Sequence, residues 1–381
     1  MAGIQLSIPR RMILVRSITI ISLMIGVLLS LPLWAGQRYF PAAPLLPLPP
    51  LLAPWDYIFP ILLLVFLFLA LLGAHPRVFL FTALIVLTWM VLNDLNRLQM
   101  WTFVYAGMLL VFVFYDGRVD DSSKFTSYFI VLQLIIPSAY FFTGFYQLNP
   151  RFCEEVLPDL LHPLHAILSE RQFLLVLKLG KTIPYFMMFI GLGLIISPVR
   201  YLAITLSVIL HVSLLFFIFP SAHNLNYALW FSNISFLVLV LFLFSGKAKQ
   251  RYYSPTFLLQ VPVFYLIFPF YIILPFLNLN NRWPDTLSFN AGTGAEKKVD
   301  IQISSETCKH LSLYEAHFYK AEKGAYHLDY QQWCREELHA EPFPDEQVFN
   351  SIYKYLLHKE SGVVKETEMQ SKPRERFLGK P

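Results

Sequence analysis

Apolar residues occur in long runs along the first three quarters of the chain, and short polar segments separate these runs. Crossing a hydrocarbon core takes roughly 20 mostly apolar residues in a helix, which satisfies its own backbone hydrogen bonds there. The runs therefore predict an all-α polytopic membrane bundle with about nine spans, and eight spans is the main alternative. The predicted spans are 13–34, 57–74, 77–93, 101–115, 125–147, 176–197, 200–219, 227–245 and 257–277.

Two segments of this membrane domain, residues 1–278, do not have the pattern of a span. Residues 35–56 are rich in proline, which opposes a regular helix, and predict an external loop over the bundle. Residues 150–171 carry apolar side chains at helical spacing beside acidic residues that include Glu155 and Asp159. This pattern predicts an amphipathic helix at the membrane surface.

After residue 278 the composition changes to that of a small soluble domain. Alternating apolar residues around a glycine-containing turn predict strands, and two later segments have the pattern of short helices. The sequence thus predicts an extracytoplasmic α+β domain over residues 279–358 and a disordered, charged tail over 359–381. The predicted elements are a β-hairpin of residues 286–290 and 298–304, a helix over 329–338 with Asp329 as its N-cap, and a helix over 346–357.

Composition and charge support a membrane location. Apolar residues make up 56% of the chain, charged residues only 14%, and the mean hydropathy is +0.52, whereas soluble domains carry about 25% charged residues. The net charge is +5, but the basic residues form no cluster interleaved with aromatic residues, so no nucleic-acid site is expected.

Basic residues gather at residues 10–16, around the start of the first predicted span, and at 247–251, between the last two. Lys and Arg are enriched in cytoplasmic loops. With nine spans, both segments lie on the cytoplasmic side. We therefore predict a multi-pass cell-membrane protein with a cytoplasmic N-terminus and an extracytoplasmic C-terminal domain.

The chain has three cysteines, Cys153, Cys308 and Cys334. In an oxidising compartment Cys308 and Cys334 could form a disulfide, and the alternative is two unpaired buried thiols. None of the spacings suits zinc, and no metal site is predicted.

His211 is the leading candidate for chemistry, because ionisable groups at membrane depth are costly and are functional hypotheses by default. It lies near the middle of a predicted span. An imidazole there could carry a proton or bind a ligand. The alternative is a structural histidine that is hydrogen-bonded to a neighbouring helix.

Lys178 and Lys181 lie three residues apart, on one face of a helix, with Tyr185 one turn further on. This group could bind an anionic substrate, a quinone oxygen or a lipid phosphate. The alternative is that the two lysines extend to the membrane interface.

Two polar segments complete the candidates. One contains Arg97 in a short loop after the third span, and the other contains Asn226 and Asn233 around the start of the eighth. Both lie toward the external half of the bundle in the predicted topology. For each, the alternative is helix capping and hydrogen bonding between helices.

Several short stretches together resemble the vitamin K-dependent γ-carboxylase-like, or horizontally transferred transmembrane (HTTM), family. The most informative is Tyr140–Phe152, which is similar to the family's aromatic-Gly-x-x-Lys-Leu-Asn/Asp element, and further similarity lies in 92–105, 210–233 and 282–289. The resemblance implies a bacterial inner-membrane protein with a helical bundle and an extracytoplasmic domain.

The chain departs from the family at the positions that carry its chemistry. Gln147 stands where the carboxylase has its lysine base, and Trp101 is the nearest match to a functional histidine. An amide takes up no proton at useful pH, so glutamate carboxylation is not expected. His211, Lys181, Arg97 and Gln147 are the catalytic candidates. Lys178, Tyr185, Asn226 and Asn233 are the binding candidates.

Two functional hypotheses follow. In the first, the protein binds or acts on a quinone or membrane lipid at an external polar cavity. In the second, it is a non-catalytic membrane subunit or scaffold that presents its C-terminal domain to an extracytoplasmic or membrane protein partner. A transporter is less favoured, because the sequence shows no inverted repeat.

Overall fold

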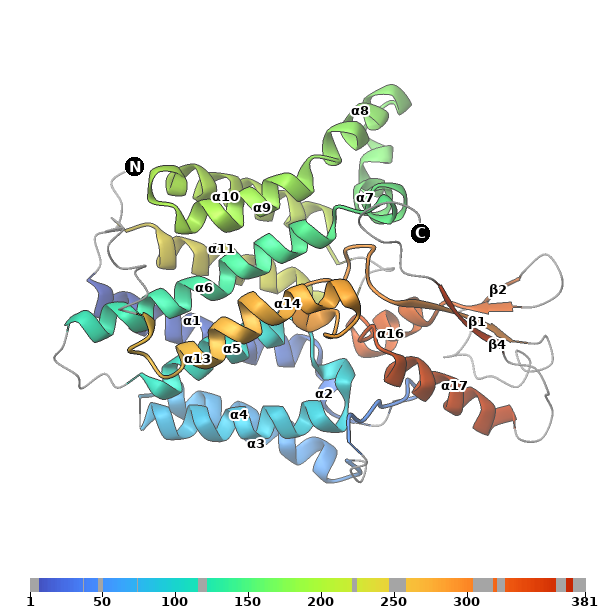
Figure 1. The fold of residues 1–381 in the computed structure, drawn as a ribbon. Coiled ribbons are helices and arrows are strands. Elements are labelled where there is room, and N and C mark those ends of the chain that lie inside the picture. Colours follow the sequence, from blue (N-terminus) through green and yellow to red (C-terminus); the bar gives the residue numbers. More distant parts are fainter. Residues whose placement is uncertain are drawn as a thin grey trace.

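The computed structural model describes residues 7–36, 38–46, 51–73, 75–115, 122–220, 225–246, 258–303, 318–320, 326–360 and 368–372. The long helices lie side by side in one bundle, and the C-terminal domain sits at one end of it (Figure 1). The bundle contains α1 (Ile8–Leu29), α2 (Leu31–Trp34), α3 (Trp55–Leu71), α4 (Pro76–Asn93), α5 (Met100–Phe114), α6 (Ser122–Tyr146), α9 (Ile183–Ile195), α10 (Arg200–Phe217), α11 (Tyr227–Phe244), α13 (Phe264–Phe268) and α14 (Leu274–Leu277).

Six helical stretches of the described residues are long and apolar enough to cross a membrane. The chain is therefore a multi-pass helical membrane protein, as predicted. The six are Ile8–Leu29, Pro76–Asn93, Phe125–Tyr146, Glu170–Ile195, Ser197–Phe217 and Tyr227–Phe244, and shorter apolar helices cover Trp55–Leu71, Met100–Phe114 and Phe264–Asn280.

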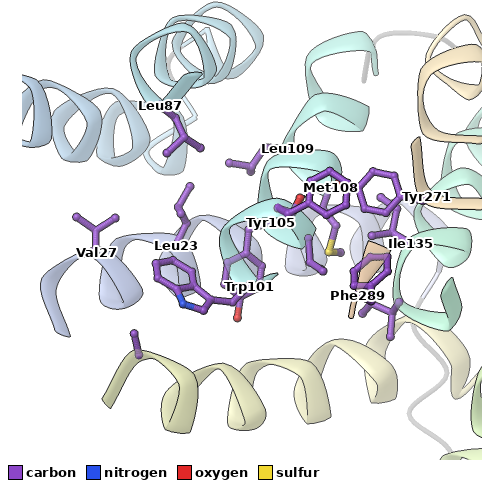
Figure 2. Close-up of a cluster of buried hydrophobic side chains, with 14 of the residues drawn as sticks. Leu23, Val27, Leu87, Trp101, Tyr105, Met108, Leu109, Ile135, Tyr271 and Phe289 are labelled. Carbon is purple, nitrogen blue, oxygen red and sulfur yellow. Dashed lines mark hydrogen bonds between the residues drawn. The ribbon is translucent and has the colours of Figure 1, made fainter. Parts of the chain in front are cut away.

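Helix α5 forms the centre of the bundle. Tyr105 and Met108 on this helix are fully buried, and they lie among side chains of α1, α4 and α6 (Figure 2). Trp101 packs onto α1 where Gly26 leaves space, because a Cβ at Gly26 would lie 2.7 Å from the Trp101 ring. Helix α5 is therefore short, and neighbouring helices bury its side chains.

Helices α6 and α9 cross with their backbones close together. A Cβ on Gly144 would lie 2.5 Å from the Pro184 carbonyl oxygen, and one on Gly191 would lie 2.6 Å from the Pro137 oxygen. Small residues allow such close approach between membrane helices, where packing replaces the hydrophobic effect. Gly144, within the stretch that resembles the carboxylase-like element, therefore has a packing role.

Two predicted spans are broken. The span predicted at 176–197 is divided at residues 181–182, between α8 (Glu170–Gly180) and α9. The last predicted span contains α13, a π-helical turn at Pro269–Ile273 and α14. Prolines explain the irregular turn, because they lack the N–H that an α-helix needs.

The segment predicted as one amphipathic helix over 150–171 is helical over residues 150–166, but the helix is irregular. The segment consists of a π-helical turn (Phe152–Val156), α7 (Leu157–Leu161) and a 3₁₀ turn (His162–Ala166). Pro158 and Pro163 interrupt the hydrogen-bond pattern. Helix α7 lies at the end of the bundle that carries the C-terminal domain (Figure 1).

The C-terminal domain contains both predicted helices, α16 (Tyr330–Leu338) and α17 (Glu346–Glu360). The Asp329 side chain accepts a hydrogen bond from the Gln332 N–H, which confirms the predicted N-cap. The domain also holds an antiparallel sheet in the order β2-β3-β1-β4, made of β1 (Lys298–Ile303), β2 (Phe318–Lys320), β3 (Tyr326–Leu328) and β4 (Glu368–Lys372).

Two predictions for this domain are wrong. The hairpin between 286–290 and 298–304 does not form, because residues Thr286–Ser288 make a 3₁₀ turn and β1 pairs with β3 and β4 instead. Within the tail that was predicted to be disordered, residues 368–372 pair with β1, with Ser371 opposite Val299.

Candidate functional site

His211 belongs to a hydrogen-bonded network that joins three helices. Its Nε2 lies 2.5 Å from the Tyr140 hydroxyl on α6, and that hydroxyl lies 2.7 Å from the Ser207 hydroxyl on α10. Its Nδ1 lies 3.0 Å from the Asn233 side-chain oxygen on α11. The two candidates His211 and Asn233 are therefore direct partners.

The hydrogen bond that the Asn233 amide makes to the backbone determines which atoms of this network donate and which accept. The Asn233 amide nitrogen donates to the Leu229 carbonyl, so its oxygen accepts from His211 Nδ1. The Nε2 atom of a neutral imidazole then accepts from Tyr140. Both ring nitrogens are satisfied, which is the arrangement expected of a structural histidine.

Arg97 takes part in a buried charge cluster at the end of the bundle near the C-terminal domain. Asp94 forms an ion pair with Arg38 at 2.6 Å and lies 3.9 Å from the Arg97 Nε. Arg97 also donates to the carbonyls of Leu33 and Met90, each at 3.1 Å. Burial lowers the pKa of Arg97 to about 10, and Asp94 opposes this shift. Arg97 thus holds the ends of α2 and α4 together.

The C-terminal domain is attached directly to this end of the bundle. The Glu337 carboxylate on α16 accepts hydrogen bonds from the backbone N–H groups of residues 39–40. The Gln99 side chain donates to the Glu341 carbonyl at 2.8 Å. These contacts fix the domain over the starts of α5 and α11.

A group of hydrogen bonds centred on one carboxylate fixes the connection from the bundle to β1. The Asp285 Oδ1 atom accepts from the side-chain amides of Asn278 and Asn290, at 2.8 and 2.9 Å, and its Oδ2 accepts from the Lys297 N–H at 3.0 Å. A carboxylate that binds both ends of a segment closes it into a turn. Residues 285–297 therefore cannot form the predicted hairpin.

The same turn positions Glu296. Its Oε2 accepts from the backbone N–H groups of Thr293 and Gly294, at 3.1 and 2.7 Å. Gly294 has φ +84°, and a Cβ there would lie 2.8 Å from the Phe152 nitrogen. The Asn149 amide donates to the Thr293 carbonyl at 2.9 Å. The turn is thereby fixed against the end of α6.

These contacts enclose a cavity of about 400 Å³ between the bundle and the C-terminal domain. Its lining includes residues at the starts of α5 and α11, Glu155 and residues 296–298. It also includes Tyr330 and Arg335 of α16 together with residues 341–344.

A larger cavity of about 1010 Å³ adjoins the first. Its lining includes the apolar segment 215–219 at the end of α10, residues 159–163, and Gln332 of α16. The residues that line both cavities are Val156, Asp159, Leu229, Arg335 and Glu341. The two cavities therefore share a wall, which we call the shared charged wall and define by Asp159, Arg335 and Glu341.

Charged groups around the cavities form ion pairs at distances of 3.3–3.9 Å. Arg335 lies 3.5 Å from Glu341, and Lys298 lies 3.3 Å from Glu155 and 3.9 Å from Glu296. Burial raises the pKa of Glu296, and Lys298 opposes this shift. Carboxylates and cations at these distances can bind polar groups of a ligand or move a proton.

The predicted site residues are scattered. Lys178, Lys181 and Tyr185 are exposed on α8 and α9, and they line neither cavity. Gln147 follows α6, and its side-chain oxygen is buried with no hydrogen-bond partner among the described residues. Asn226 lines the smaller cavity and caps α11 by accepting from the Leu229 N–H at 3.0 Å.

The predicted disulfide involves Cys308, which lies outside the described residues. Its predicted partner Cys334 is a buried, free thiol in α16. Cys153 is also free, and it is partly exposed.

Sequence reasoning missed Glu296, Arg335 and Glu341, and it placed Glu155 and Asp159 on an amphipathic helix at the membrane surface. No local pattern marks these residues, because the cavity forms only when distant segments dock. The available signal was the excess of charge just outside the bundle, in segments 154–159 and 335–341.

No family model, curated protein or solved structure matches this chain. The fold defines its class, a multi-pass helical membrane protein with a small α+β domain attached to one end. Its function is therefore argued from the cavities.

Proposed function

We propose that the larger cavity binds a membrane lipid or a lipid-like quinone at the external surface of the membrane. The observation that carries this proposal is the cavity's mixed lining. The apolar side chains of residues 215–219 and the shared charged wall line the same cavity. An amphipathic molecule matches such a cavity, since ligand sites combine an apolar lining with a few polar groups.

The position of the cavity supports this ligand class. The apolar side is the end of a helix that can cross the membrane, and Phe216 and Phe219 there are 52% and 63% exposed. Exposed aromatic side chains at a helix end are typical of the membrane interface. A lipid could thus enter sideways from the bilayer and place its polar part against α16.

The proposal includes nine membrane crossings with the C-terminal domain outside. The three shorter apolar helices lie in the same bundle as the six longer ones. Helix α5 has 15 residues, about 22 Å at ~1.5 Å per residue. This is shorter than a hydrocarbon core of about 30 Å, but its neighbours bury it.

Single-cysteine labelling tests this topology. Cysteines would be placed one at a time at Ser7 and Gln347 in a variant without native cysteines, and intact cells would be treated with an impermeant maleimide. Only Gln347→Cys should be modified. Labelling at Ser7→Cys would contradict this topology.

A pair of phenylalanine variants tests the ligand proposal. Phe216 lines the cavity, whereas Phe186 is equally exposed, at 51%, on α9 away from it. The full-length protein would be purified in mild detergent, and bound lipids and quinones would be counted by mass spectrometry. Phe216→Ala should lower bound ligand about tenfold, the effect of losing one buried aromatic contact, and Phe186→Ala should not.

Equal amounts of bound ligand in the two variants would contradict the proposal. If the preparations contain no lipid or quinone but a protein partner copurifies through the C-terminal domain, the scaffold hypothesis is the better account. Neither function requires the carboxylase reaction, for which Gln147 offers no lysine base.

A further inference from the structure

The shared charged wall determines which polar group the larger cavity can accept. It carries one guanidinium, on Arg335, and two carboxylates, on Asp159 and Glu341. The formal charges of these three side chains sum to about −1. Burial raises the pKa of Glu341, and Arg335 opposes this shift. A ligand with a net negative headgroup would meet repulsion there, while a headgroup with both charges would find partners for each.

Arg335 is the available partner for an anion. Its only ion pair among the described residues is the 3.5 Å contact of one terminal nitrogen, Nη1, with Glu341. A guanidinium has five N–H donors in a planar fork that fits phosphate oxygens. Arg335 thus has donors free to bind a phosphate.

The carboxylates are the available partners for a cation. Asp159 is exposed toward the cavity, and Glu341 lies beside Arg335. A primary ammonium has three N–H donors for such oxygens, whereas a quaternary ammonium has none. The wall therefore distinguishes two zwitterionic headgroups by their hydrogen bonding, and distinguishes both from an anionic one by charge.

The apolar side of the cavity is held in a fixed shape. Trp230 Nε1 donates to the Leu215 carbonyl at 3.0 Å, and the Phe219 ring contacts the Trp230 ring at 5.9 Å between centroids. These contacts hold Phe219 in the lining of the cavity. An acyl chain could lie along this surface while the headgroup reaches Arg335.

We propose that the ligand of the larger cavity is a phospholipid whose headgroup joins a phosphate to a primary ammonium, as in phosphatidylethanolamine. Its phosphate binds Arg335, and its ammonium binds Asp159 and Glu341. This inference rests on the proposed lipid site and specifies its ligand.

Native mass spectrometry of the delipidated full-length protein tests this specificity. Dioleoyl phosphatidylethanolamine, phosphatidylcholine and phosphatidylglycerol would be titrated separately. The ethanolamine lipid should bind about tenfold more tightly than either of the others, the effect of one charge-assisted hydrogen bond. Asp159→Asn should reduce this preference to threefold or less, and Arg335→Gln should weaken all three lipids.

Glu170→Gln is the matched control, because Glu170 is an exposed acidic residue on α8 that lines neither cavity. It should leave the preference unchanged. Equal affinity for the three lipids, with Phe216→Ala still weakening each, would overturn the headgroup inference and leave the lipid site intact. Equal binding by Phe216→Ala and Phe186→Ala would overturn the lipid site itself.

Discussion

The His211 network and the shared charged wall contain similar polar groups in opposite surroundings. Within the bundle, His211, Tyr140 and Asn233 satisfy one another and border neither cavity. Between the bundle and the C-terminal domain, Arg335 and Asp159 border open space and are only partly paired. Buried polar groups that are fully hydrogen-bonded stabilise a fold, whereas uncommitted groups beside a cavity are available to a ligand.

The largest loss of stability is expected at Asp94, in the buried charge cluster. Asp94→Ala leaves Arg38 and Arg97 buried without their carboxylate, and loss of one partner of a buried ion pair costs about 3–5 kcal/mol. Thermal unfolding in detergent should show this loss. Glu154→Ala, at an exposed acidic residue, is the control. A melting curve like that of the unmodified protein would show that the cluster does not hold this end of the bundle.

A smaller loss is expected at His211. His211→Ala leaves the Asn233 amide oxygen unpaired and takes from the Tyr140 hydroxyl one of its two partners, and it should cost about 2–4 kcal/mol. Ser207→Ala, at the end of the network, should cost about 1 kcal/mol. Bound lipid per protein should stay constant in both variants. A stable His211→Ala protein that has lost its lipid would reverse the roles given to the two regions.

Variants at the shared charged wall should lose bound lipid and keep their stability. Arg335→Gln should lower bound lipid about tenfold while changing the free energy of unfolding by less than about 1 kcal/mol, because its ion pair with Glu341 is partly exposed. Arg171→Gln, at an exposed site on α8, serves as the control. Unfolding measurements and lipid counts on the same preparations separate the two effects. A large loss of stability with unchanged lipid would make Arg335 a structural residue.

The smallest effect concerns pH. Because burial raises the pKa of Glu296 in the folded protein, its protonated form favours folding. That contribution is complete below the unfolded-state pKa and is lost as pH rises through the raised folded-state pKa. Glu296→Gln keeps an oxygen for the Thr293 and Gly294 N–H groups but carries no charge. Its melting temperature should therefore fall less between pH 5 and 8 than that of the unmodified protein. An equal or steeper fall would contradict this account.

The helical bundle could be predicted from the sequence because each membrane helix is a contiguous run of apolar residues. The interruptions could be predicted less well. Pro158 and Pro163 break a segment whose apolar spacing is helical, and Asp285 binds side chains and backbone of a turn that has the alternation of a hairpin. In both cases a specific hydrogen-bond pattern overrides the periodicity.

The site was predicted only in part. His211 and Asn233 were both selected, and they are partners, because polar residues at membrane depth stand out from their surroundings. Asp159 and Arg335 did not stand out, because each is an ordinary surface charge within its own segment. They reach one wall only because the C-terminal domain docks onto the bundle through contacts such as that between Gln99 and Glu341.

The most direct test of the lipid site is a crosslinking map. The full-length protein in nanodiscs would be photolysed with a phosphatidylethanolamine that carries a diazirine near its headgroup, and the modified peptides would be identified by mass spectrometry. We predict that modification concentrates in residues 156–163 and 332–341, which carry the shared charged wall of the larger cavity. Modification confined to the exposed surface of α9, with none in these two segments, would contradict the account.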